Sequence, residues 1–142
     1  MNTLYIFPGQ GSQYVGMGKD LYDEYEVARK IYNKATDVLG FDVAELSFTD
    51  PDNRLNFTRF TQPALLTHHI ACLEVFRERG GEKTEPTMAA GHSLGEYSAL
   101  VAAGILTFDR ALRLVQKRGE LMSAHGEGEM TAFPIDLETI RP

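Results

Sequence analysis

A serine framed by glycines lies where a strand pattern gives way to a helix pattern, and this junction constrains the fold most. Residues 91–95 read GHSLG, which matches the pattern G-x-S-x-G. They follow a weak strand candidate at 87–90 and precede a small-residue helix pattern that runs from Leu94 to Gly104. Glycines two positions away on either side let the backbone turn sharply without a steric clash. Ser93 is therefore predicted to lie on a tight strand-to-helix turn, with its hydroxyl exposed. The alternative is an inert serine at a glycine-rich helix start.

Strand and helix patterns alternate along the whole chain. Residues 4–7 are wholly apolar and end at a Pro-Gly pair, which predicts a strand buried on both faces. The other predicted elements are helices at 24–39, 61–80 and 107–124, a polar stretch at 42–59 with a turn at 50–53, and a third strand at 130–133. Such alternation predicts an α/β fold in which helices cover a parallel sheet. Three strands fall below the usual number of about five or six, so we expect an incomplete sheet.

Composition and charge exclude several classes of protein. The formal net charge of −6 argues against nucleic-acid binding, which depends on clustered Lys and Arg. One cysteine, Cys72, excludes a disulfide framework and a Cys-x-x-Cys zinc site, and it suits a reducing compartment. No apolar run approaches the roughly 20 residues of a membrane helix, and the N-terminus has no signal-peptide pattern. We therefore expect a cytoplasmic protein with neither a nucleic-acid nor a membrane partner.

Arg118 is anomalous within the helix pattern at 107–124. At about 100° per residue it lies in the middle of an apolar arc that includes Ala111 and Val115. A guanidinium there must meet an anion or reach solvent. The functional interpretation is a bidentate clamp for a substrate carboxylate. The alternatives are a side chain that extends to solvent, or a structural ion pair with an acidic residue such as Glu96.

A nucleophilic serine needs a general base, and no histidine here is well placed for that role. In the hydrolase-like order the histidine follows the serine. His92 adjoins Ser93, but neighbouring side chains on such a turn point apart. His125, the only histidine downstream, is expected to be a surface or loop residue rather than a base. His68 and His69 lie in the predicted second helix without metal-ligand spacing, so no metal site is expected.

Four motifs stand in a fixed order along the chain: FPGQGSQ at 7–13, TQPAL at 61–65, GHSLGEYSAL at 91–100 and RGELM at 118–122. Together they resemble the malonyl-CoA:acyl-carrier-protein transacylases, the family that includes the FabD-type enzymes of fatty acid synthesis and the acyltransferases of polyketide synthases. The resemblance covers essentially the whole chain. It is most similar to a discrete acyltransferase that acts in trans.

The resemblance implies a ping-pong reaction that needs no metal or organic cofactor, with malonyl-CoA as the substrate. Ser93 would take the acyl group from CoA and pass it to the phosphopantetheine thiol of an acyl carrier protein. Gln10 and Leu94 would donate their backbone amides to an oxyanion hole. Arg118 would bind the free carboxylate of the malonyl group. The residues implied to bind substrate or to flank the nucleophile are Arg118, Gln62 and His92.

The chain departs from this family in length. Family members are considerably longer, and their catalytic histidine follows a small ferredoxin-like subdomain. Residues 1–128 are accordingly expected to form the N-terminal part of an α/β-hydrolase-like core, and 129–142 to begin the ferredoxin-like subdomain. The base would come from a further C-terminal segment or a second chain. Two alternatives stay open: a hydrolase of acyl thioesters, and a non-catalytic N-terminal fragment or half of a split enzyme.

Overall fold

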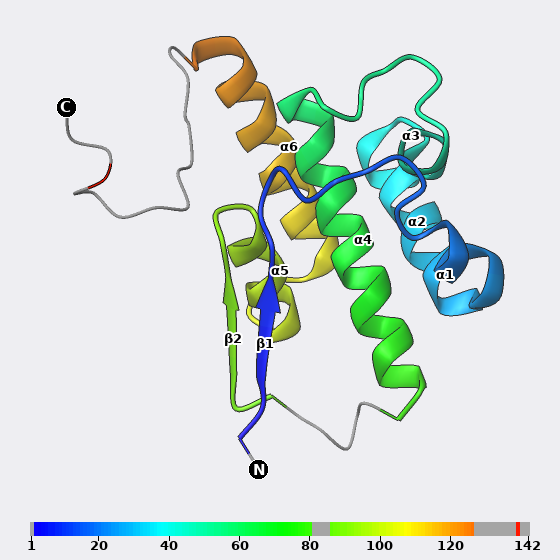
Figure 1. Ribbon diagram of the computed structural model, residues 1–142, viewed down its shortest axis with the longest axis vertical. Coiled ribbons are helices and arrows are strands. Elements are labelled where there is room, and N and C mark those ends of the chain that lie inside the picture. Colours follow the sequence, from blue (N-terminus) through cyan, green and yellow to red (C-terminus); the bar gives the residue numbers. More distant parts are fainter. Residues whose placement is uncertain (1, 81–85, 127–138, 140–142) are drawn as a thin grey trace.

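The computed structural model describes residues 2–80, 86–126 and 139 (Figure 1). Its elements are β1 (Leu4–Phe7), α1 (Lys19–Glu24), α2 (Glu26–Leu39), α3 (Val43–Phe48), α4 (Thr58–Glu78), β2 (Met88–Gly91), α5 (Gly95–Ala102) and α6 (Phe108–His125). The predicted strand at 130–133 and the expected subdomain at 129–142 lie outside these residues, apart from position 139.

The two described strands form a parallel pair, as the alternating pattern predicts. Leu4 is opposite Met88 and Phe7 is opposite Gly91, so both strands end at the same edge of the sheet. The backbone N–H of His92 extends this pairing by donating to the carbonyl of Phe7 at 3.0 Å. The loop after β1 and the turn after β2 therefore start side by side.

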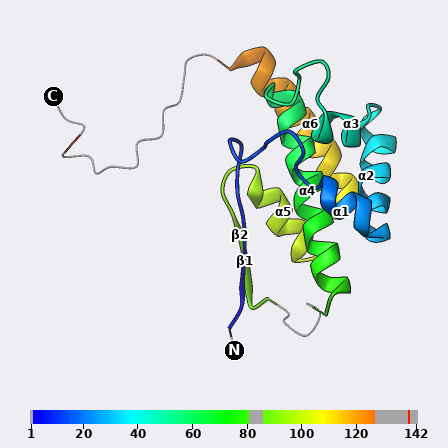
Figure 2. The same ribbon diagram turned by 45° about the vertical axis from the view of Figure 1, so that its right-hand side comes forward.

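The helices cover one face of this strand pair (Figure 2). Phe7 is buried and Tyr5 is half-buried, but Leu4 is 50% exposed and Ile6 is 71% exposed. The prediction that this strand is buried on both faces is wrong for the part of the chain that the structure describes. A wholly apolar run gives no indication of which of its faces is covered, because both faces look alike in the sequence.

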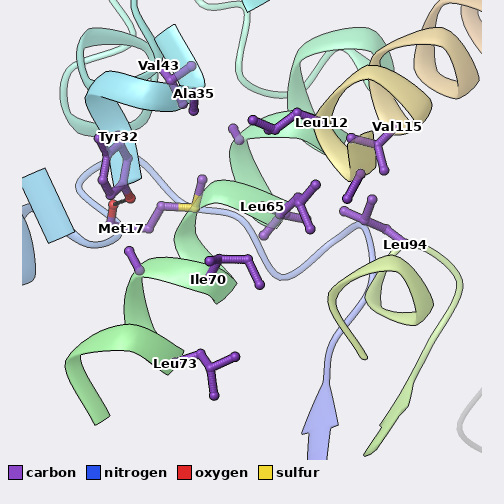
Figure 3. Close-up of a cluster of buried hydrophobic side chains, with 14 of the residues drawn as sticks. Met17, Tyr32, Ala35, Val43, Leu65, Ile70, Leu73, Leu94, Leu112 and Val115 are labelled. Carbon is purple, nitrogen blue, oxygen red and sulfur yellow. Dashed lines mark hydrogen bonds between the residues drawn. The ribbon is translucent and has the colours of Figure 1, made fainter. Parts of the chain in front are cut away.

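The core surrounds α4, which packs against α2, α5 and α6. Figure 3 shows the cluster, in which side chains of α2, α4 and α6 meet those of Met17 and Leu94 from the connecting segments; its fully buried large residues include Met17, Tyr32, Leu65, Ile70, Leu94, Leu112 and Val115. The apolar spacing in the predicted helix at 61–80 places Leu66, Ile70, Leu73 and Phe76 on its inner face; the first three are buried, whereas Phe76 is 46% exposed. None of the described helices is both long and apolar enough to span a bilayer, α4 included.

Helix boundaries differ from the predictions at the N-terminal side. The predicted helix at 24–39 begins at Glu26, because Tyr25 is extended and separates it from the unpredicted α1. The polar stretch at 42–59 contains α3, which the Asp42 side chain caps by accepting from the Glu45 amide at 2.8 Å. The turn at 50–53 is confirmed.

The helix predicted to start at Thr61 starts three residues earlier, at Thr58, so that Pro63 lies inside α4 rather than in its first turn. The strand predicted at 87–90 is β2, one residue later. The helices predicted at 94–104 and 107–124 are α5 and α6, and the hydroxyl of Thr107 caps α6. The start of α5 lies against the carboxyl end of β1, and Thr58 at the start of α4 accepts a hydrogen bond from Gln10 in the loop after β1.

Candidate functional site

Ser93 occupies a sharp turn between β2 and α5, as predicted. Its φ is +52°, a left-handed conformation that costs a non-glycine residue on the order of 1–3 kcal/mol. Two hydrogen bonds hold the turn: the Gly95 amide donates to the His92 carbonyl at 2.9 Å, and the Glu96 amide donates to the Ser93 carbonyl at 3.2 Å. Ser93 is exposed at the start of α5. The strand-turn-helix interpretation of the GHSLG motif is confirmed.

The two glycines of the motif are required by close backbone contact. A Cβ on Gly91 would overlap the backbone of Gly95, and a Cβ on Gly95 would overlap the carbonyl oxygen of Phe7. Only hydrogen at these positions lets α5 start against the ends of both strands. The unfavourable φ of Ser93 is thus maintained by the packing around it.

Arg118 on α6 links Ser93 to Gln62 on α4. Arg118 Nη2 donates to Ser93 Oγ at 2.9 Å, and Arg118 Nη1 donates to Gln62 Oε1 at 2.8 Å. Gln62 is fully buried in α4, and its Nε2 lies 3.2 Å from Met122 Sδ. The Arg118 guanidinium also lies 5.9 Å from the centre of the Tyr97 ring. The structure therefore brings together three predicted site residues that are widely separated in the sequence.

The positive charge of Arg118 is not neutralised within the described residues. Its two side-chain acceptors, Ser93 and Gln62, are uncharged, and it takes part in no ion pair there. The alternative of a structural pair with Glu96 thus finds no support. A guanidinium stays ionised and offers donors in a planar fork, which suits a carboxylate. The arrangement can hold an acid group beside the serine hydroxyl.

Gln10 and Leu94 occupy corresponding positions after the two strands. Gln10 is three residues past Phe7, Leu94 is three residues past Gly91, and those strand ends are register partners. In the described ranges neither the Gln10 nor the Leu94 backbone amide donates a hydrogen bond. The Leu94 side chain is fully buried, which fixes the backbone beside Ser93. Both amides are available to an oxyanion formed at this edge.

No histidine of the described chain is hydrogen-bonded to Ser93. His92 is exposed in the turn, and its ring lies against Gly9. His125 is exposed at the last position of α6. The residues that the structure describes also hold no cluster of three or more His, Cys, Asp or Glu side chains suited to a metal ion.

Sequence reasoning missed a buried polar contact behind the turn. His69 Nδ1 lies 2.9 Å from Ser98 Oγ, which joins α4 to α5. Burial lowers the pKa of His69 to about 4, with a smaller contribution from the neighbouring His68. The imidazole is therefore neutral near pH 7. The nearby Cys72 has its pKa raised to about 11 by burial, so its thiol is protonated and a poor nucleophile.

Several malonyl CoA-acyl carrier protein transacylases are similar to this chain. The one from Bacillus subtilis (strain 168) is 46% identical over 141 residues, which cover 96% of this chain and 44% of that protein. The crystal structure of the one from Clostridium perfringens ATCC 13124 aligns with a TM-score of 0.81 at 41% identity, covering 86% of this chain and 38% of that chain. A malonyl-transacylase in complex with its type II PKS acyl-carrier protein (PlMCAT:AntF, holo) aligns with a TM-score of 0.81 at 47% identity, covering 87% and 40%.

The match extends over nearly the whole sequence. Residues 4–141 fit the family model described as acyl transferase domain. The chain spans less than half of the length of the Bacillus subtilis relative, 44%. It aligns with the solved transacylases over most of its own length, in agreement with the α/β arrangement of helices on a small parallel sheet. The chain therefore belongs to the acyl transferase domain family.

Proposed function

We propose that this chain carries the nucleophile and the carboxylate clamp of an acyltransferase. That enzyme would move a malonyl group from CoA to the phosphopantetheine thiol of an acyl carrier protein. The observation that supports this most is the 2.9 Å contact between Arg118 Nη2 and Ser93 Oγ, made by a cation without an anionic partner in the described chain. In malonyl-CoA one methylene separates the free carboxylate from the thioester carbonyl, so a nucleophile and a cation in contact suit the two ends of the acyl group.

In the first half-reaction, Ser93 Oγ attacks the thioester carbonyl carbon and its proton passes to a base. The carbonyl oxygen becomes an oxyanion, to which the amides of Gln10 and Leu94 donate. Collapse of this intermediate breaks the carbon–sulfur bond. CoA leaves as the thiol after it takes up the proton, and a malonyl ester remains on Ser93. Arg118 holds the malonyl carboxylate throughout, supported by Gln62, while His92 flanks the nucleophile.

In the second half-reaction, the phosphopantetheine thiol of the carrier protein attacks the ester. The thiol proton passes by way of the base to Ser93 Oγ, which restores the free hydroxyl. Fatty acid and polyketide synthesis both use this transfer, and one similar transacylase was solved with a type II PKS carrier protein. Neither half-reaction requires a metal or an organic cofactor.

We further propose that a C-terminal segment or a second chain supplies the base. In that arrangement residues 1–128 are part of an α/β-hydrolase-like core, residues 129–142 begin a ferredoxin-like subdomain, and the enzyme acts in the cytoplasm. The support for this proposal is the 44% of the Bacillus subtilis relative that the chain spans, together with the lack of a histidine hydrogen-bonded to Ser93 in the described residues.

We expect residues 1–142 alone to be inactive, because they lack the base. The test is therefore intact-protein mass spectrometry after the complete enzyme, including the segment or chain that supplies the base, is mixed with malonyl-CoA. We expect an adduct of one malonyl group that is lost when carrier protein is added. The adduct should be absent in Ser93→Ala and retained in Ser123→Ala, which removes an exposed hydroxyl on α6. Equal labelling of Ser93→Ala and the unsubstituted protein would refute the proposal.

A thioester hydrolase is a second candidate, because the exposure of Ser93 also admits water. It predicts loss of the malonyl adduct without a carrier protein, at a rate that matches transfer. A non-catalytic fragment or scaffold half is the third, and it predicts that Ser93 carries no adduct even when the base-supplying segment is present; turnover by residues 1–142 alone would also exclude it. The mass measurement with and without carrier protein separates transfer from hydrolysis, and the presence or absence of any adduct on Ser93 tests the third candidate.

A further inference from the structure

The segment that leads into α4 contacts the loop after β1 through two side-chain hydrogen bonds. Gln10 Nε2 donates to Thr58 Oγ1 at 3.1 Å, and Gln13 Nε2 donates to Asn56 Oδ1 at 2.9 Å. Gln13 Oε1 accepts a hydrogen bond from the Gly11 backbone N–H at 2.8 Å. Asn56 thus fixes Gln13, and Gln13 in turn holds the backbone next to Gln10.

The same segment also lies against the helix that carries Arg118. A Cβ on Gly119 would lie 2.9 Å from Arg59 Cα and 3.1 Å from the Thr58 carbonyl oxygen, so only glycine permits this approach of α6 to α4. Gly119 directly follows Arg118 in the chain. Residues 56–59 therefore contact both the loop that bears Gln10 and the helix that bears the guanidinium.

We propose that Asn56 and Thr58 are positioning residues. They hold the loop at 9–13 so that the backbone N–H of Gln10 stays aligned with the hydroxyl of Ser93. This inference rests on the proposed function, in which that amide stabilises an oxyanion. Catalytic geometry tolerates little displacement, since a shift of about 1 Å can cost on the order of a hundredfold in rate. Loosening the loop would slow the acylation step, while the substrate would still be held by Arg118.

The variants are chosen as matched pairs. Thr58→Val removes the hydroxyl and keeps the shape, whereas Thr58→Ser keeps the hydroxyl. Asn56→Leu removes the acceptor for Gln13, whereas Asn56→Asp keeps an oxygen in its place. Because Asn56 is exposed and Thr58 is only half-buried, we expect all four proteins to fold.

The first measurement is backbone hydrogen exchange at Gly11, made on the chain itself and independent of activity. We expect exchange to become about three- to tenfold faster in Asn56→Leu and Thr58→Val, the size of effect typical of one lost hydrogen bond. Exchange in α2 should be unchanged, and Asn56→Asp and Thr58→Ser should match the unsubstituted protein. Unchanged exchange at Gly11 in both deletion variants would overturn the inference, as would equal acceleration in the conservative variants.

The second measurement is the rate of malonyl-enzyme formation under single-turnover conditions in the complete enzyme, with the base-supplying segment present. The deletion variants should lower the maximal acylation rate about three- to tenfold with KM for malonyl-CoA changed less than about twofold. A rise in KM at unchanged maximal rate would contradict the positioning role. If no malonyl ester forms on Ser93 even with the base-supplying segment present, the proposed function fails, and the exchange measurement still decides whether these residues hold the loop.

Discussion

The polar site at the carboxyl end of β1 and the apolar groove beside the strand differ in how far other described residues contact or cover them. At its carboxyl end, Ser93, Arg118 and Gln62 are linked by hydrogen bonds of 2.8–2.9 Å. Along its length, an apolar groove of about 500 Å³ lies open between β1 and α4. Its lining residues include Leu4, Ile6, Leu65, His69, Leu73 and Phe76. The polar side chains at the end of the strand are thus bonded to one another across three segments of the chain, whereas the strand itself is covered on one side only.

His69, one of the residues that line the groove, has a buried ring nitrogen without a partner in the described chain. His69 Nε2 is buried without a hydrogen bond, while Nδ1 of the same ring contacts Ser98 behind the nucleophile turn. His69 therefore lies between the two regions: its ring contacts Ser98 in the helix after Ser93, and the residue is part of the lining of the groove.

The largest expected effect is within β1, where neighbouring residues lie in opposite environments. Phe7 is 8% exposed, so Phe7→Ala should lower the free energy of unfolding by about 3–5 kcal/mol. Ile6 is 71% exposed, and Ile6→Ala should change it by less than about 0.5 kcal/mol. Urea unfolding of both variants provides the measurement. Similar losses in the two variants would show that the outer face of β1 is covered in solution.

The next effect is a pH dependence that originates in the groove. The pKa of His69 is about 4 in the folded chain against 6.5 as its ordinary value, so between these pH values protons bind the unfolded chain preferentially. Stability is therefore complete above about pH 6.5 and falls by about 3 kcal/mol as the pH drops to 4. Burial lowers the pKa of His68 as well, which adds a contribution of the same sign.

His69→Gln should flatten this dependence, as measured by urea unfolding between pH 7 and pH 4. The matched control is His125→Gln, which changes an exposed histidine and should leave the slope as it is. A steep slope that persists in His69→Gln would show that the ring is not held in its neutral form by burial.

A smaller effect is expected on acyl loading at the site beside the carboxyl end of β1. Arg118→Gln keeps donors near Gln62 and Ser93 but removes the charge. We expect the rate of malonyl loading to fall by a factor that corresponds to about 1.5–3 kcal/mol, the contribution of a hydrogen bond to a charged group. Acetyl loading should change little, because acetyl has no carboxylate. Equal losses for both acyl groups would indicate a structural role for the guanidinium.

The sequence predicts the site at the carboxyl end of β1 better than it predicts which faces of the strand are buried, and the reason is physical. The turn at Ser93 follows from glycine spacing, and the inward position of Arg118 follows from helical periodicity; both are local properties. The contact of Arg118 with Gln62 was not predicted from periodicity, because the two residues are 56 positions apart.

The missed features depend on tertiary contacts. The six-residue helices α1 and α3 are too short for periodicity to detect, and a cap at Asp42 fixes only the second. The pairing of His69 with Ser98, and that of Asn56 with Gln13, each join segments brought together only by folding. The exposed face of β1 was not predicted, because in a wholly apolar run the sequence of the strand is the same for a covered face and an uncovered one.

The most direct test of the Ser93–Arg118 account is competition between malonyl-CoA and acetyl-CoA at equal concentrations, read as the acyl group found on the tryptic peptide that contains residue 93. A cation held 2.9 Å from the nucleophile predicts that malonyl predominates by at least about tenfold. Equal amounts of the two esters, or an acyl group attached to any other residue, would contradict it.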